Sequence, residues 1–156
     1  MSTTLVIGLG NILLGDEGVG VEVINILKEK PLPPSVVLMD GGTGGIDLLP
    51  KIIGSDRVVI IDAAKMGLTP GEYRTFQMED IAPKECPEFS LHDLALPDIL
   101  KLGSILSELP PILLIGVEPA TIEMNKPLSD TIRKSLPSIV SFSYEAILDF
   151  TQEVVH

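Results

Sequence analysis

Short aliphatic runs alternate along the chain with stretches whose apolar residues recur at helical spacing. Four runs, at residues 4–9, 36–39, 58–61 and 112–117, are mostly aliphatic and are followed by glycine or an acidic residue. Continuous runs of this kind are typical of parallel strands that are buried on both faces. Residues 72–76 instead alternate polar and apolar side chains, which predicts an edge strand.

Helices are predicted between these strands. Apolar residues at 17–28 fit a helix buried over much of its circumference, and residues 46–53 fit a short one. Ser90 is expected to cap a helix that runs to about residue 102, and Ser129 to cap a final helix toward the C-terminus. Pro137 lies inside that last pattern, where it either kinks the helix or marks its true start.

Strand–helix alternation of this kind predicts an α/β fold. We expect a single three-layer domain over residues 1–156, built on a mostly parallel, twisted five-stranded sheet with helices on both faces. The composition agrees, because 45% of the 156 residues are hydrophobic but only 4% are aromatic, so the core must be aliphatic.

Charge and cysteine content narrow the class of protein. Basic side chains number 11 against 22 acidic ones, and a net charge of −11 repels phosphate backbones, so no nucleic-acid partner is expected. The single cysteine, Cys86, excludes an internal disulfide framework and points to a reducing compartment. The N-terminus lacks a basic region, and no apolar run reaches the length of a membrane span. We therefore predict a cytoplasmic protein without membrane insertion.

Acidic residues follow each of the four buried strands. Asp16 and Glu17 come after the loop that ends the first strand, and Asp40, Asp62 and Glu118 follow the other three. Ligands of open parallel sheets bind at the carboxyl ends of the strands, so this edge is the expected site. A turn or capping role would explain one such residue, but four positions at one edge should repel one another, and a bound cation would relieve the repulsion.

Histidine completes a ligand set. His92 is the only histidine apart from the terminal His156, and it stands at the predicted start of a helix. Two carboxylates and one imidazole suit a borderline divalent metal with open coordination positions. The set that we select is Glu17, Asp62 and His92, with Asp16 and Asp40 in reserve.

Other chemistries have weaker support. Residues 8–10 after the first strand resemble a dinucleotide-binding turn, and Asp40 would suit a ribose, but Leu13 occupies the place of the third glycine. The chain has no phosphate-binding Gly-Lys-Ser/Thr loop and no Gly-x-Ser-x-Gly nucleophile elbow. Acidic neighbours would oppose thiolate formation at Cys86, which is expected to be a spectator. No organic cofactor is predicted.

Five separated segments resemble one family, the hydrogenase maturation endopeptidases. They are GLGNILLGDEGVGVEVI at 8–24, DGGTGG at 40–45, VVIIDAAKMGLTPGEYR at 58–74, SLHDLAL at 90–96 and IGVEP at 115–119. The resemblance covers nearly the whole chain, and the motifs occur in the family's order. Members of this family trim the C-terminal extension from the large-subunit precursor of nickel–iron hydrogenases. Within the third segment, residues 62–74 (DAAKMGLTPGEYR) are most similar to members that serve formate-hydrogenlyase-type hydrogenases.

The resemblance implies a five-stranded sheet flanked by helices and assigns the metal ligands to Glu17, Asp62 and His92. Asp40 matches a position expected to support the substrate or the site, and Asp16 is the weaker ligand candidate. The implied function is an endopeptidase that recognises nickel already present in the precursor, so the precursor supplies the metal. Two alternatives stay open: a nickel-sensing chaperone that binds the precursor without cutting it, and a nucleotide-binding oxidoreductase, which would bind NAD.

Overall fold

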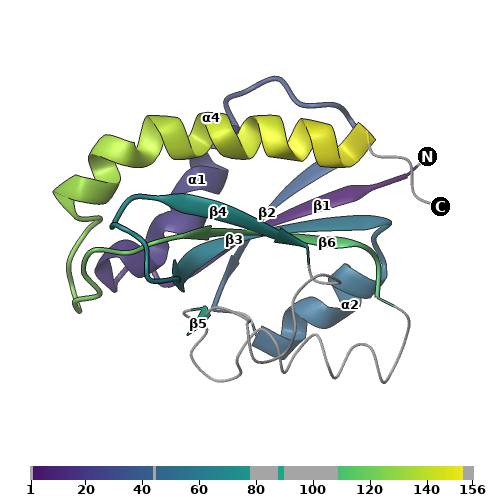
Figure 1. The fold of residues 1–156 in the computed structure, drawn as a ribbon. Coiled ribbons are helices and arrows are strands. Elements are labelled where there is room, and N and C mark those ends of the chain that lie inside the picture. The colour runs from purple at the N-terminus through teal and green to yellow at the C-terminus, as the bar shows by residue number, and fades with distance from the viewer. Residues whose placement is uncertain (1, 44, 78–87, 90–108, 153–156) are drawn as a thin grey trace.

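A computed structural model describes residues 2–43, 45–77, 88–89 and 109–152. Its centre is a sheet in which five strands follow the order β2-β1-β3-β6-β4 (Figure 1). Parallel pairing joins the first four strands of that order, and β4 pairs with β6 in the antiparallel direction. The strands are β1 (Thr4–Leu9), β2 (Val36–Gly42), β3 (Arg57–Lys65), β4 (Tyr73–Gln77) and β6 (Ile112–Val117). The predicted five-stranded, mostly parallel sheet is confirmed.

The hydrophobic pattern predicted the bounds of some strands correctly but not those of β3. β1 and β6 have the predicted bounds, and the predicted edge strand is β4 at the end of the sheet. β3, however, continues past Asp62 to Lys65, so the prediction that it ends at Asp62 is wrong. The additional length has partners, because Asp62 and Ala63 pair with β6, and Ala64 and Lys65 pair with the two-residue strand β5 (Glu88–Phe89). Asp62 therefore lies inside a hydrogen-bonded strand.

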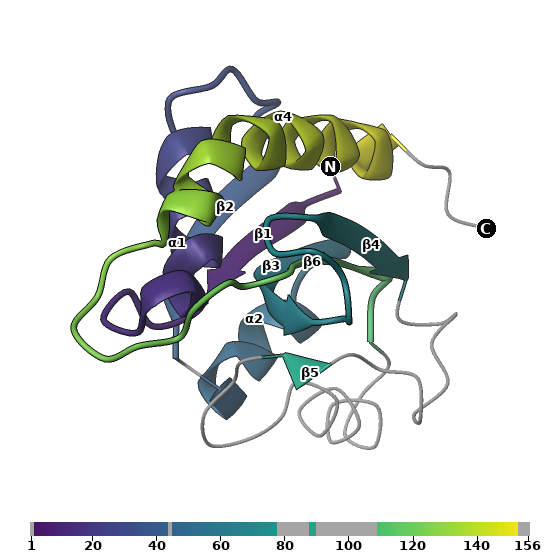
Figure 2. The same cartoon turned by 60° about the vertical axis from the view of Figure 1, so that its left-hand side comes forward.

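Helices cover both faces of the sheet, as predicted. α1 (Val19–Leu27) follows the 3-10 helix η1 (Gly15–Gly18), and α2 (Leu49–Ile53) follows the 3-10 helix η2 (Gly45–Leu48). Figures 1 and 2 show α1 and the long helix α4 (Asp130–Gln152) on one face of the sheet and α2 on the other.

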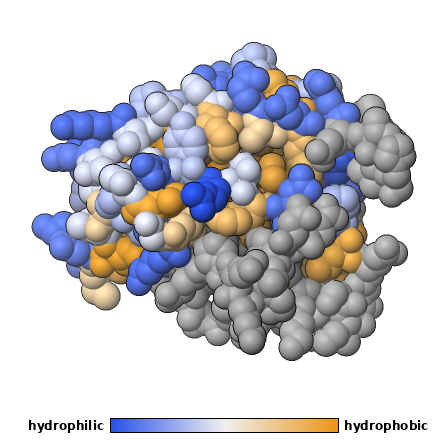
Figure 3. Space-filling view, viewed as in Figure 1, coloured by the Kyte–Doolittle hydropathy of each residue, from blue (hydrophilic) through white to orange (hydrophobic). Residues whose placement is uncertain are grey.

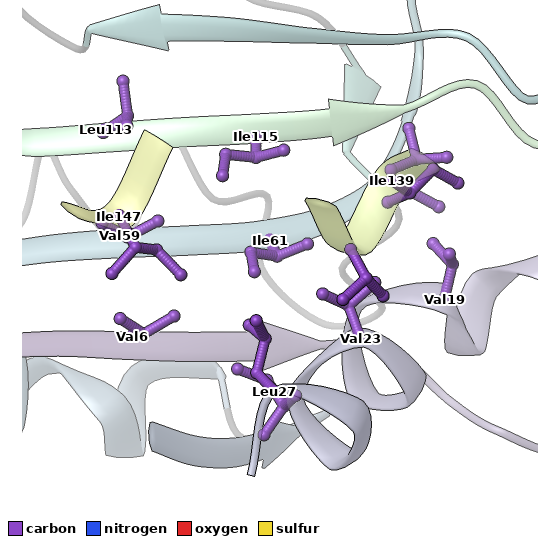
Figure 4. Close-up of a cluster of buried hydrophobic side chains, with 14 of the residues drawn as sticks. Val6, Val19, Val23, Leu27, Val59, Ile61, Leu113, Ile115, Ile139 and Ile147 are labelled. Carbon is purple, nitrogen blue, oxygen red and sulfur yellow. The ribbon is translucent and has the colours of Figure 1, made fainter. Parts of the chain in front are cut away.

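Two aliphatic clusters hold these layers together. On the side of α1 and α4, Val59 and Ile61 of β3 pack with side chains from both helices (Figure 4). The neighbouring residues Val58 and Ile60 point to the opposite face and pack with Ile52 of α2. Alternate side chains of one strand are thus buried on both faces, which explains why the strand sequences are continuously apolar. Each such side chain contributes about 1.5–3 kcal/mol of hydrophobic free energy.

The last helix begins where the sequence predicts. The Ser129 hydroxyl accepts a hydrogen bond from the Ile132 amide at 3.3 Å, so Ser129 caps α4. The helix runs through Pro137, and the alternative that Pro137 marks its start is wrong. Figures 1 and 2 show the first turns inclined to the remainder. Proline causes such a bend because it lacks the amide hydrogen and its ring clashes with the preceding turn.

Several predictions concern residues outside those described. These are the helix expected over residues 90–102, with His92, and the side chains of Cys86 and His156. The extent of the domain over residues 1–156 also stays a prediction. Within the part of the chain that the structure describes, every helix is too short or too polar to traverse a lipid bilayer.

Candidate active site

Acidic residues meet at the carboxyl ends of the parallel strands. Gly8 of β1 aligns with Asp40 of β2 on one side and with Ile61 of β3 on the other. Asp62, one residue further along β3, aligns with Gly116 of β6. The register therefore brings the carboxyl ends of all four parallel strands to one edge of the sheet, as the sequence predicted.

Glu17 and Asp62 are the most distinctive groups at this edge. The two residues are only 2% and 0% exposed, and each interacts with other groups of the protein. Asp62 Oδ1 accepts a hydrogen bond of 2.8 Å from the Ala63 amide. Glu17 lies in η1, which contacts β3, so the two carboxylates come from elements that pack together. Because removing a carboxylate from water is unfavourable, two buried ones at a ligand-binding edge indicate a functional site.

Glycines let η1 approach the sheet. Gly10 has a φ of 132°, and a Cβ there would overlap the carbonyl oxygen of Glu17. Gly20, at the start of α1, faces the carbonyl oxygens of Leu9 and Ile61 so closely that a Cβ would overlap both. Gly10 therefore allows the loop to pack against η1, and Gly20 allows α1 to pack against the end of β1 and against Ile61 of β3.

Asp16 has a different environment from its neighbour Glu17. It is fully buried, at 0% exposure, and accepts hydrogen bonds from two amides, those of Ala120 at 2.8 Å and Thr121 at 2.9 Å. Ser129 adds two more, from its amide at 2.7 Å and its hydroxyl at 2.8 Å. Four donors satisfy both carboxylate oxygens. Asp16 thus holds η1 against the segment between β6 and α4.

Asp40 is exposed and shapes the end of β2. Its Oδ1 accepts a hydrogen bond of 2.9 Å from the amide of Gly42, whose φ is 49°. The carbonyl oxygen of Gly42 in turn accepts a hydrogen bond of 2.8 Å from the Gly10 amide. Asp40 therefore stabilises a turn that is hydrogen-bonded to the loop between β1 and η1.

Glu118 braces the chain that follows β3. Its Oε1 accepts hydrogen bonds from the amides of Met66 at 2.8 Å and Leu68 at 2.9 Å. Its backbone is bound in the same turn, because the Glu118 carbonyl oxygen accepts from the Gly71 amide at 2.9 Å. Glu118 holds the turn after the strand that carries Asp62.

Comparison with known proteins identifies the family. The model of the hydrogenase maturation protease family matches residues 21–146 of the chain. The chain belongs to this family. It is 35% identical over 131 residues to the hydrogenase 2 maturation protease of Escherichia coli, which covers 82% of this chain and 80% of that protein. It is 33% identical over 150 residues to a hydrogenase expression/formation protein of Azotobacter chroococcum, across 90% of this chain and 71% of the relative.

Solved structures agree. The hydrogenase maturating endopeptidase HybD of Escherichia coli superposes with a TM-score of 0.78 at 29% identity, covering 94% of this chain and 93% of that one. The solution structure of an endopeptidase from Escherichia coli gives a TM-score of 0.82 at 31% identity, across 96% and 94% of the two chains. The predicted family and enzyme class, a maturation endopeptidase, are confirmed.

Local hydrogen bonds in this maturation protease change the expectation that its acidic strand ends need a cation. The repulsion expected among acidic residues at four strand ends does not by itself require a cation, because backbone amides stabilise Asp16, Asp40 and Glu118. The two buried carboxylates of Glu17 and Asp62 are the ones not explained by a turn or cap. No cluster of three or more potential metal ligands occurs among the described residues, which do not include His92.

The sequence did not reveal what Asp16 binds. Ser129 was predicted only as a helix cap, and Ala120 and Thr121 contribute backbone amides, which carry no side-chain signal. The proximity of the two segments follows from tertiary packing alone.

Proposed function

We propose that this maturation protease removes the C-terminal extension of the large-subunit precursor of a nickel–iron hydrogenase after nickel has been inserted. The family is one of endopeptidases that mature hydrogenases, which supports cleavage over a chaperone that binds without cutting. The observation that carries the assignment is the pair of buried carboxylates, Glu17 and Asp62, at the carboxyl edge of the sheet.

Nickel in the precursor is the group that these carboxylates recognise in this proposal. Glu17 and Asp62 supply oxygen ligands, and His92 supplies an imidazole nitrogen. Such a set binds Ni²⁺ without the thiolates that would retain it, so the metal can leave with the product. The nickel is part of the substrate and not a resident cofactor. Asp16 and Asp40 support the site through the contacts described above.

Cleavage follows from positioning in this scheme. Once nickel is held, the adjacent C-terminal tail lies beside the carboxylates. The scissile bond and the catalytic groups then react within one complex, which lowers the entropic cost of the reaction. A water oxygen attacks the scissile carbonyl carbon, its proton passes to a base, and the C–N bond breaks as the new amine takes up a proton. A carboxylate base would make the enzyme an aspartic-type endopeptidase. We further propose a cytoplasmic location, since the single cysteine forms no internal disulfide.

The test uses one cognate precursor in two forms, loaded with nickel and free of nickel, incubated with the purified protein. Intact mass is the readout. Shortening of the loaded form alone is the expected result. Shortening of both forms would overturn nickel recognition while leaving the peptidase activity. Nickel-dependent binding at unchanged mass would overturn cleavage and favour the chaperone.

A further inference from the structure

Exposed apolar side chains concentrate beside the candidate active site. Five large apolar side chains are exposed among the described residues, and four of them lie on two loops. The loop after β1 carries Ile12 and Leu13, exposed to 56% and 60%. The segment between β6 and α4 carries Ile122 and Met124, exposed to 40% and 74%. These four side chains are called the apolar rim below.

Backbone hydrogen bonds make the two loops one surface. The Asn125 amide donates to the Leu13 carbonyl oxygen at 2.7 Å, and the Gly15 amide donates to the Lys126 carbonyl oxygen at 2.9 Å. The buried carboxylate of Asp16 also joins these two parts of the chain, because it accepts hydrogen bonds from the amides of Ala120 and Thr121. Figure 3 shows the hydrophobic colouring of this area at the lower left, over the loops at the carboxyl ends of the strands. A surface held in this way loses little conformational entropy when a partner binds.

A hollow adjoins the apolar rim. It has a volume of about 340 Å³ and lies between the η1 region and the first turns of α4. Ile12 lines it together with Pro127, Leu128 and Leu136, and its charged residues are Glu22 and Arg133. A hollow of this size and lining accepts an apolar side chain of a partner. Gly15 and Gly18, the ends of the 3-10 helix that contains Glu17, also line it, so the hollow and the candidate active site share η1.

We propose that the apolar rim and this hollow dock an apolar surface segment of the folded large-subunit precursor and so determine which precursor is cut. This inference rests on the proposed function. A polypeptide that brings its tail to Glu17 and Asp62 must approach the loop that also carries Ile12 and Leu13. A second copy of the chain is the less suitable occupant, because a net charge of −11 on each copy opposes self-association.

The test compares the double variant Leu13→Ser/Met124→Ser with Val37→Ser. Val37 is the fifth exposed apolar residue, at 47%, and lies on β2 near the other end of the sheet, opposite Leu5. With nickel-loaded precursor, the double variant should raise KM at least about tenfold and leave kcat within about twofold. Val37→Ser should change neither. Thermal unfolding of each variant should match the wild type, since the replaced side chains are exposed.

Two results would overturn docking and spare the proposed function: a wild-type KM in the double variant, or a wild-type dimer in sedimentation that the double variant converts to monomer. If the wild type fails to shorten a confirmed cognate precursor, the proposed function fails. In that case the docking proposal is tested by the Kd for the same precursor. Docking requires that the double variant bind at least about tenfold more weakly than the wild type and that Val37→Ser leave the Kd unchanged.

Discussion

The Asp16 carboxylate accepts hydrogen bonds from both the amide and the hydroxyl of Ser129, at 2.7 Å and 2.8 Å, although the two residues are 113 positions apart. The same serine caps α4. One contact therefore connects the loop that follows the first strand to the start of the last helix. The adjacent acidic residues thus have different surroundings: Asp16 is hydrogen-bonded to the segment before α4, and Glu17 belongs to the proposed active site.

The Asp16→Asn variant should lose stability. An amide presents only one acceptor oxygen and places an NH₂ group against backbone donors, so the change should lower the free energy of unfolding by about 2–4 kcal/mol. Urea unfolding followed by circular dichroism measures this. Asp149→Asn is the matched control, because Asp149 is exposed on α4, and it should shift the free energy by less than about 0.5 kcal/mol. Equal stabilities of the two variants would contradict the assigned role of Asp16.

Gly10→Ala should disrupt the placement of Glu17. The new Cβ would overlap the Glu17 carbonyl oxygen at a backbone φ of 132°, so we expect the free energy of unfolding to fall by at least about 3 kcal/mol and precursor cleavage to be lost.

Gly67→Ala separates backbone strain from steric overlap in that experiment. Gly67 has a φ of 74°, and an added Cβ would meet nothing within 4 Å. Strain alone should lower the free energy of unfolding by about 1–2 kcal/mol. If urea unfolding gives Gly10→Ala and Gly67→Ala the same loss, the close approach of Gly10 to Glu17 has no energetic consequence.

Neutralising Glu17 or Asp62 should abolish cleavage without lowering stability. Glu17→Gln and Asp62→Asn should each abolish shortening of the nickel-loaded precursor, measured by intact mass. Thermal unfolding should show stability kept or raised, because a neutral amide has a smaller desolvation penalty than a carboxylate. His92→Ala should also abolish cleavage. The exposed Glu29→Gln should leave both readouts unchanged. Wild-type cleavage by any of the first three variants would remove that residue from the proposed site.

Glu118 offers a test of charge against hydrogen bonding. Glu118→Gln keeps an acceptor oxygen for the Met66 and Leu68 amides, so it should lower the free energy of unfolding by less than about 1 kcal/mol and retain cleavage. Glu118→Ala leaves both amides without this acceptor and should lower the free energy by about 2–3 kcal/mol. A folded Glu118→Gln variant that no longer cleaves would show that the negative charge takes part in the reaction.

Local sequence determined the elements of this protein and much of its class. The bounds of β1 and β6, the cap at Ser129 and the two-sided burial of the strands follow from residue type and periodicity, which act over a few neighbouring positions. The separated motifs were sufficient to indicate the family, which the comparisons confirm.

Tertiary structure alone decided the different environments of the acidic residues. Asp16 and Glu17 are chemically alike neighbours, and only the packing of η1 against the segment from Ala120 to Ser129 sends the Asp16 carboxylate into four hydrogen bonds. Asp62 lies inside β3 because β5 and β6 supply ladder partners beyond the hydrophobic run. These outcomes depend on groups far away along the chain, many of them backbone amides that every sequence contains, so no local pattern could specify them.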